Sequence, residues 1–135
     1  MSVKISGEYL GNKKVKLRHE LSGTELITAA PLDNQGDGSS FSPTDLTAAS
    51  LGSCMLTTMA IFAEKDGIDL SGMSMEVEKV MSANPRRIAE LNLIITLPAK
   101  LSPEERIKLE RVAHTCPVSR SLHAELHAPI EFRYL

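Results

Sequence analysis

The sequence contains no tryptophan, and only 4% of its 135 residues are aromatic. A core without large rings must be built from aliphatic side chains and methionine, so a chain of this length gains only moderate stability from burial. A dimer that shares one core would add to that stability, but composition alone does not require one. The length predicts a single domain that spans residues 1–135.

The sequence also lacks an excess of positive charge and a long apolar run. Its 15 Lys and Arg residues are interleaved with 17 Asp and Glu residues, for a net charge of −2. Nucleic-acid binders normally carry a basic face or tail, so no nucleic acid is expected as a partner. No apolar run approaches the roughly 18 residues of a membrane span, and residues 1–8 lack the apolar stretch of a signal peptide. We therefore expect a cytoplasmic protein without a membrane partner.

Cysteine is rare, and the only two are Cys54 and Cys116. The cytoplasm keeps thiols reduced, so a structural disulfide is not expected. Among proteins in general, two buried and inert cysteines are the commoner case. The alternative, a pair of reactive thiols, depends on the sequence around each one.

Alternating polar and apolar residues predict three strands in the first third of the chain. The simplest arrangement is an antiparallel meander over residues 3–9, 14–18 and 24–30, with turns at Gly11-Asn12 and Ser22-Gly23. The alternation places Lys14, Lys16 and Arg18 on one face of the second strand. A solvated strand face is the favoured interpretation, and a cation for a nearby thiolate is the alternative.

A polar, glycine-rich loop over residues 33–41 precedes a strong helix start at Ser42-Pro43-Thr44-Asp45. Ser42 can cap the helix, and Asp45 stands where the acid of a capping box belongs. The helix is expected to run to about Glu64. Its apolar and small residues on every side predict a core helix buried all round and too short to span a membrane. Cys54 lies in its middle.

The rest of the chain predicts two more strands, two more helices and a last strand. These are expected over residues 73–81, 88–97, 102–114, 116–125 and 129–135. Cys116 precedes Pro117 and should cap the third helix, where unpaired N–H groups lower the pKa of a thiol. Cys54 in an apolar helix should be inert unless a cation lies against it. These local arguments favour Cys116 as the more reactive thiol.

Two motifs resemble the OsmC/Ohr family, and the resemblance spans nearly the whole chain. The first runs from Phe41 to Cys54, a Ser-Pro-x-acid-Leu opening followed by small residues that end in cysteine. The second is Cys116-Pro-Val-Ser-Arg-Ser-Leu122. Two motifs in the right order and at the right separation are far more specific than either alone.

The resemblance implies an α+β OsmC-like fold, in which antiparallel sheets wrap a buried central helix and two chains intertwine as a homodimer. It further implies a thiol peroxidase that reduces organic hydroperoxides. Cys54 would attack the peroxide and become a sulfenic acid, and Cys116 would resolve it as a disulfide that a dithiol reductant then clears. No cofactor is implied.

The family also places an arginine, held by an acid, beside the attacking cysteine. Here Lys14 occupies the usual arginine position, and Arg18 is the only arginine on that strand face. Lysine lacks the planar fork of arginine. The acid corresponds to Asp45, nine residues before Cys54 and so on nearly the opposite helix face. Asp45 as a simple capping acid and Asp45 as part of a catalytic network stay equal alternatives.

A zinc site and a small-molecule binding site are the alternatives to the peroxidase. A zinc site would need the four histidines of the chain, which are His19, His114, His123 and His127. No metal-ligand spacing connects these histidines to the cysteines, so no metal is expected. A non-catalytic or redox-sensing protein that binds a small molecule on the same fold is the alternative, because the arginine and acid positions depart from the family pattern.

Overall fold

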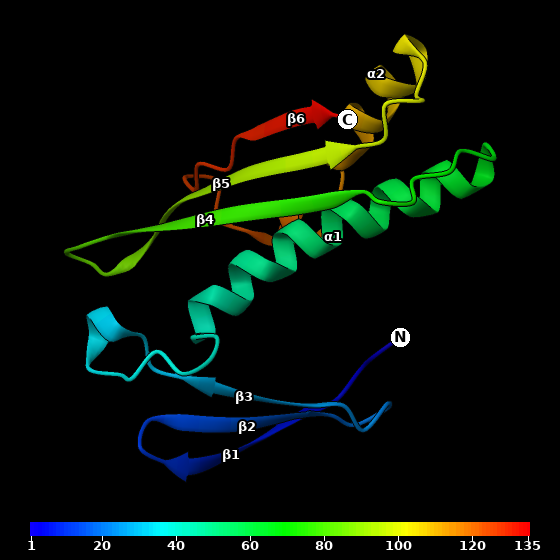
Figure 1. Cartoon of the computed structure of the whole chain (residues 1–135). Coiled ribbons are helices and arrows are strands. Elements are labelled where there is room, and N and C mark those ends of the chain that lie inside the picture. The colour runs from blue at the N-terminus through cyan, green and yellow to red at the C-terminus, as the bar shows by residue number, and fades with distance from the viewer. The chain divides into compact units, whose positions relative to one another are not determined.

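The computed structural model describes residues 1–135, which divide into two compact units, Met1–Leu46 and Thr47–Leu135. Both strands and helices are present, as the α+β expectation requires (Figure 1). In chain order the elements are β1 (Ile5–Gly11), β2 (Lys14–His19), β3 (Glu25–Ala29), the 3₁₀ turn η1 (Leu32–Asn34), α1 (Pro43–Lys65), β4 (Ser74–Ser82), β5 (Arg87–Leu97), α2 (Pro103–Ala113), α3 (Pro117–Ser121) and β6 (Ile130–Tyr134).

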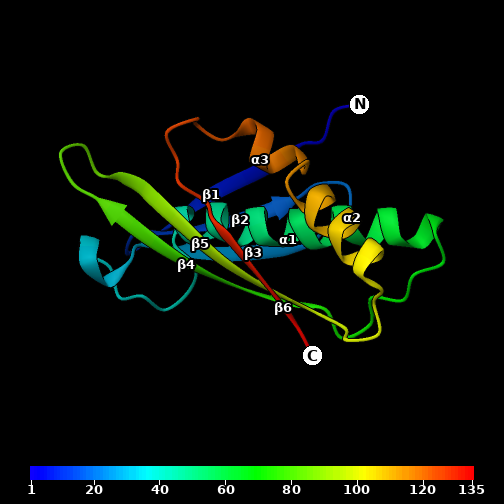
Figure 2. The same cartoon turned by 90° about the horizontal axis from the view of Figure 1, so that it is seen from above.

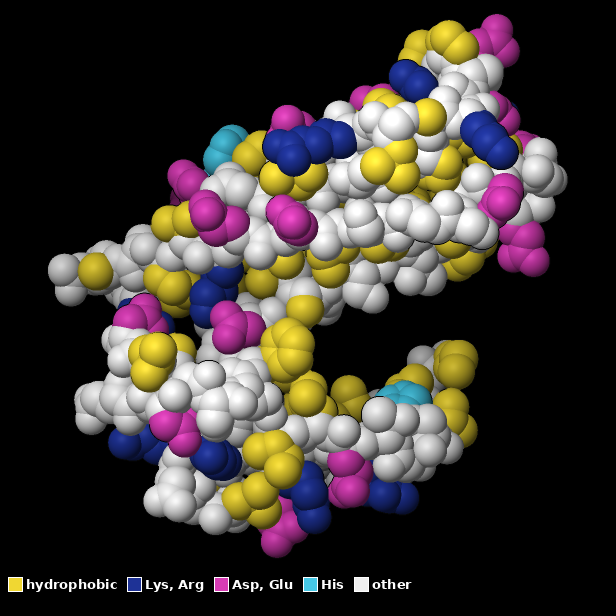
Figure 3. Space-filling model, in the orientation of Figure 1, with side chains coloured by type: hydrophobic (Ala, Val, Ile, Leu, Met, Phe, Trp, Pro, Cys, Tyr) yellow, Lys and Arg dark blue, Asp and Glu magenta, His cyan; other side chains and the backbone are white.

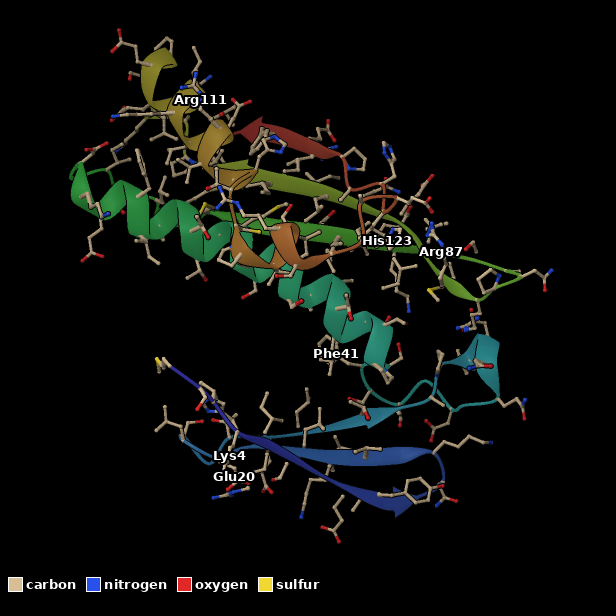
Figure 4. All side chains as sticks on the ribbon, turned by 180° about the vertical axis from the view of Figure 1, so that it is seen from behind. Lys4, Glu20, Phe41, Arg87, Arg111 and His123 are labelled. Atoms are coloured by element: carbon tan, nitrogen blue, oxygen red, sulfur yellow. The ribbon has the colours of Figure 1, made fainter.

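The first unit is the expected antiparallel meander, with β2 between β1 and β3. The turn between β1 and β2 is formed by Asn12 and Lys13, one residue later than predicted. Their φ angles of 55° and 60° are those of a type I′ turn, whose twist matches that of the flanking strands. At the other end of the β1–β2 pair, the Glu20 N–H donates to the Lys4 carbonyl at 3.1 Å (Figure 4).

The meander has one apolar face, formed where Tyr9 pairs with Val15 across the strands. Ile5 and Leu17 lie on the same face, because side chains two residues apart on a strand point the same way. Ile5 and Tyr9 are 68% and 67% exposed. Hydrophobic side chains are accordingly visible at the surface of the molecule (Figure 3).

Helix α1 has well-defined ends. The Asp45 N–H donates to Ser42 Oγ at 3.1 Å, and the Ser42 N–H donates to Asp45 Oδ2 at 2.8 Å, so the predicted capping box is confirmed. At the other end Gly67 has a φ of 66°, and the Ile68 N–H reaches back to the Ala63 carbonyl at 2.9 Å. This is a Schellman motif, which requires the left-handed conformation that glycine adopts without strain.

The expectation that α1 is buried all round is wrong for the single chain. Its buried residues form one stripe at intervals of three or four, Ala48, Leu51, Gly52, Met55, Met59 and Ala63, while Ile61 is 56% exposed. The expectation that α1 is too short to span a membrane is also wrong, because its 23 residues are long and apolar enough to do so. What identifies α1 as a core helix is the buried stripe.

The second sheet has the order β4-β5-β6, and its topology corrects one prediction. Strands β4 and β5 are antiparallel, as expected, but β6 is parallel to β5. The sheet is therefore mixed. The connection from β5 to β6 contains α2 and α3, and such a helical crossover returns the chain to the same end of the sheet.

The core of the second unit forms between the sheet and the helices (Figure 2). Alternate residues of β5 contribute four fully buried side chains, and α1 and α2 supply the opposing surface. The four are Leu91, Leu93, Ile95 and Leu97. Ser102 and Glu105 form the second predicted capping box at the start of α2. Burial of α1 and α2 against one sheet fixes where the loop between α2 and α3 lies.

Helix α3 is shorter than predicted and ends at Ser121 instead of about Glu125. The chain leaves the helix because Leu122 adopts an extended conformation, with φ −85° and ψ 158°. The segment after it is tied to β5, since Arg87 lies 3.8 Å from Glu125. His123, in the same segment, accepts from the Glu125 N–H at 3.1 Å (Figure 4).

Candidate functional site

Cys116 caps helix α3, as the sequence predicted. Its backbone is extended, with φ −64° and ψ 143°, and Pro117 follows as the first helical residue. The Ser119 N–H donates to Cys116 Sγ at 3.3 Å. The side chain is 0% exposed and belongs to the hydrophobic core of the second unit. The Cys116 thiol is therefore closed off from solvent, and the backbone at the start of α3 directs a donor at its sulfur.

Cys54 lies in the middle of α1, beside the buried stripe, and is half-buried. It packs against the core cluster that contains Cys116. The Cys54 thiol also interacts with the Cys116 thiol, which places the two side chains next to each other. Both cysteines are reduced in this structure. The fold thus brings the only two thiols of the chain together, one accessible from outside and one not.

Burial raises the pKa of the Cys116 thiol above its ordinary value, because a thiolate in the core loses its hydration. The hydrogen bond from the Ser119 N–H acts in the opposite direction, and the neighbouring Cys54 raises the pKa further. The prediction of a lowered pKa from the capping position is therefore wrong. The capping geometry is present, but the desolvation of a fully buried sulfur outweighs it.

A close approach of α1 to strand β4 lies just before Cys54. Gly52 is buried, and a Cβ atom there would lie 2.6 Å from Met75 Sδ and 2.7 Å from Met75 Cε. The absence of a side chain at Gly52 therefore makes room for Met75 against the helix. The sequence showed Gly52 only as one of several small residues, because nothing local to it reveals which side chain it faces.

The cations on strand β2 all have acidic partners within the first unit. Lys14 Nζ lies 3.1 Å from Asp37 Oδ2, and Arg18 Nε lies 3.7 Å from Glu20 Oε1. Lys16 lies 3.7 Å from Glu8 and 3.8 Å from Glu25. These pairs agree with the interpretation of a solvated strand face. Because Lys14 and Arg18 belong to the first unit and Cys54 to the second, a role beside Cys54 stays a prediction.

Asp37, the partner of Lys14, has a lowered pKa. Hydrogen bonds from the Ser39 side chain and backbone, followed by the pairing with Lys14, lower the pKa of Asp37 to about 2. Asp45, the acid singled out by sequence, binds the Ser42 N–H at the start of α1. Its capping role is established, and its part in a catalytic network stays a prediction. The chain holds no group of three or more His, Cys, Asp or Glu side chains that could bind a metal ion.

A second cluster of side chains in this unit was not expected from sequence. The Tyr134 hydroxyl on β6 donates to Glu110 Oε2 on α2 at 2.6 Å, and the Arg106 guanidinium lies 4.0 Å from the centre of the Tyr134 ring. Burial and then Glu110 raise the pKa of Tyr134 well above its ordinary value. No local motif could have revealed it, because the strand and the helix are separated by α3 in sequence.

The comparison with protein families matches the model described as OsmC-like protein over residues 36–131, which includes both cysteines. The chain belongs to the OsmC family. A crystal structure from Psychrobacter arcticus 273-4, provisionally described as an osmotic stress induced and detoxification response protein, is 41% identical. The superposition covers 98% of this chain and 96% of the Psychrobacter arcticus chain, with a TM-score of 0.90. A comparison with curated proteins found no match.

More distant structures share the fold. An OsmC like protein from Mycoplasma pneumoniae is 18% identical, with a TM-score of 0.84 and coverage of 100% of this chain and 98% of its own. An organic hydroperoxide resistance protein, OsmC, from Legionella pneumophila is 21% identical, with a TM-score of 0.75. The superposition covers 98% of this chain and 97% of the Legionella pneumophila chain. These likenesses confirm the OsmC-like fold.

Proposed function

We propose that this protein is a thiol-dependent peroxidase that reduces organic hydroperoxides. The observation that carries the proposal is the contact between half-buried Cys54 and fully buried Cys116 in a member of the OsmC family. A peroxide reaches only a thiol that is accessible, and a resolving thiol must lie beside the oxidised one. The resistance to organic hydroperoxides named for the Legionella pneumophila protein supports the same chemistry.

The reaction begins at Cys54. Its thiolate attacks the O–O bond of a hydroperoxide, so an S–O bond forms as the O–O bond breaks and the alkoxide leaves. The alkoxide takes a proton from solvent, and the products are a Cys54 sulfenic acid and an alcohol. Cys116 then attacks the Cys54 sulfur, the S–S bond forms, and the sulfenic oxygen leaves as water with the Cys116 proton. A dithiol reductant restores both thiols and is itself oxidised to a disulfide. The chain needs no metal or cofactor for these steps.

The division of roles follows from burial. Cys116 is sealed in the core with a raised pKa, so it stays protonated and out of reach of a bulky peroxide. Cys54 has the exposure that the attacking residue requires. This is the reverse of what the local sequence suggested, and it agrees with the roles that the family resemblance implied.

We further propose Lys14 or Arg18 as the cation beside the Cys54 thiolate, and Asp45 as the acid that orients it. Lys16 on the same strand face offers a matched control. Replacement of the functional cation by alanine should slow Cys54 oxidation at least tenfold, on the order of one charge pair in a partly buried site, while Lys16→Ala should not. Equal rates in Lys14→Ala, Arg18→Ala and Lys16→Ala would remove both cations from the mechanism.

We propose that the protein is cytoplasmic and works as a homodimer. The single chain leaves Ile61 on α1 and Ile5 and Tyr9 on the meander exposed, and a second copy would cover apolar side chains of this kind. Light scattering coupled to size-exclusion chromatography should give twice the mass of one chain. A monomer at micromolar concentration would contradict the dimer.

The test of the function is oxidation of the reduced, folded protein by cumene hydroperoxide, followed by mass spectrometry. We expect a loss of two hydrogens per chain, and faster oxidation by cumene hydroperoxide than by hydrogen peroxide. Cys54→Ser should abolish the reaction, and Cys116→Ser should stop after one turnover as a sulfenic acid that dimedone traps. Exposed Ser53 provides the matched control, Ser53→Ala. Multiple turnovers in Cys54→Ser would refute the assignment, and no oxidation at all would favour a binding role.

A further inference from the structure

We infer that the dithiol reductant attacks the sulfur of Cys54, and that Cys116 leaves as a thiolate held by the Ser119 N–H. The inference rests on the proposed function, since it concerns the second half of that cycle. It goes further by assigning the attacked atom, the leaving group and a backbone donor that positions the leaving sulfur.

The choice of the attacked sulfur follows from access. A thiolate must approach a disulfide in line with the S–S bond, on the side opposite the leaving sulfur. Cys116 is 0% exposed and lies among the core side chains of the second unit, so no reductant can reach it from outside. Cys54 is half-buried at the edge of the same cluster. Attack at Cys54 is therefore the open route.

The leaving group follows from the hydrogen bond already present in the reduced protein. The Ser119 N–H donates to Cys116 Sγ at 3.3 Å, and this bond becomes charge-assisted when the sulfur leaves as a thiolate. The Val118 N–H also interacts favourably with this sulfur. Pro117 and the turn of α3 hold these donors in place, so they need no rearrangement when the S–S bond breaks.

The step balances in atoms and electrons. One thiolate of the dithiol forms a bond to Cys54 Sγ, the Cys54–Cys116 bond breaks, and Cys116 takes the electron pair. The high pKa of its buried sulfur then favours uptake of a proton. The second thiol of the reductant attacks the mixed disulfide, closes its own disulfide and releases Cys54. The reductant loses two electrons, and the protein gains them.

The first test maps the attacked sulfur in the unmodified protein. The disulfide is prepared with diamide, exposed briefly to 2-mercaptoethanol, quenched in acid and alkylated with N-ethylmaleimide under denaturing conditions. Peptide mass spectrometry should find the mercaptoethanol adduct on Cys54 and the maleimide on Cys116. The adduct on Cys116 would overturn the inference.

The second test removes the donor. Ser119→Pro deletes the N–H, while Ser119→Ala deletes only the hydroxyl, so the two variants differ in the hydrogen bond to sulfur. With dithiothreitol as the reductant, the disulfide in Ser119→Pro should be reduced on the order of tenfold more slowly than in Ser119→Ala. Equal rates would overturn the role of the donor. If Ser119→Pro fails to fold by circular dichroism, the mapping in the unmodified protein still decides the attacked atom.

The two proposals can fail separately, because diamide forms the disulfide without any peroxidase activity. A disulfide that forms with diamide but not with hydroperoxide would refute the proposed function and leave the mapping decisive for the attacked sulfur. A protein in which neither oxidant joins Cys54 to Cys116 would overturn both.

Discussion

Cys54 on α1 and Cys116 at the start of α3 lie against each other, and only Cys54 is accessible from outside. The contact exists because α1 and the loop before α3 pack into one core beneath strand β5. The inequality in exposure gives the two thiols different chemistry, although both sit in the same cluster.

The two thiols should differ in their pH dependence of alkylation. Because burial raises its pKa, Cys116 should react slowly with iodoacetamide at neutral pH, and its rate should increase only at a pH above that of an ordinary thiol. The measurement is a pH series on Cys54→Ser, in which Cys116 is the only thiol. The same protein in denaturant is the control, and there Cys116 should titrate near 8.5. Identical profiles in both states would contradict the buried thiol.

The close approach of Gly52 to Met75 should appear in a double-mutant cycle. Gly52→Ala places a Cβ 2.6 Å from Met75 Sδ, and we expect a loss of about 1–3 kcal/mol in the free energy of unfolding. In a Met75→Ala background the same change should be neutral or stabilising, since alanine favours a helix by up to about 1 kcal/mol over glycine. Urea unfolding measures all four proteins. Additive effects would show that the two residues do not press on each other.

Tyr134→Phe should cost about 1 kcal/mol of unfolding free energy, because it removes the hydrogen bond to Glu110 from a half-buried site. The folded-state pKa of Tyr134 lies above that of the unfolded chain. Its contribution is therefore complete below about pH 10 and declines as the pH rises further. The difference in stability between the parent protein and Tyr134→Phe should shrink in strong alkali. Glu110→Gln, which keeps an acceptor, is the control and should cost less than Tyr134→Phe.

Asp37 offers a test in the meander that is independent of the cysteines. Its folded-state pKa of about 2 lies below the ordinary 3.8, so its favourable interactions are complete above about pH 4 and are lost as the pH falls toward 2. NMR titration of the carboxyl group measures this directly. Ser39→Ala should raise the pKa more than Lys14→Ala, because the bond from the Ser39 side chain is the largest single cause of the lowered pKa, while the backbone N–H bond remains in the alanine variant. The opposite order would identify the ion pair as dominant.

Local sequence predicted most of the secondary structure, because short-range rules govern it. The meander follows from period-two alternation, and both capping boxes follow from Ser-Pro-x-acid motifs whose partners lie three residues apart. The prediction failed where partners are distant. The parallel pairing of β6 with β5 depends on how the α2–α3 crossover packs.

The sequence by itself determined which residues could react, since the chain has two cysteines in two recognisable motifs, and it determined that Cys116 would cap a helix. Only the tertiary structure decided whether the pKa of the Cys116 thiol is lowered or raised at that capping position. Folding buries the Cys116 sulfur completely, and the lost hydration outweighs the backbone donor that the motif supplies. Capping is a local property that sequence encodes directly. Desolvation is a sum over α1, α2 and β5, and it exists only once they have packed together.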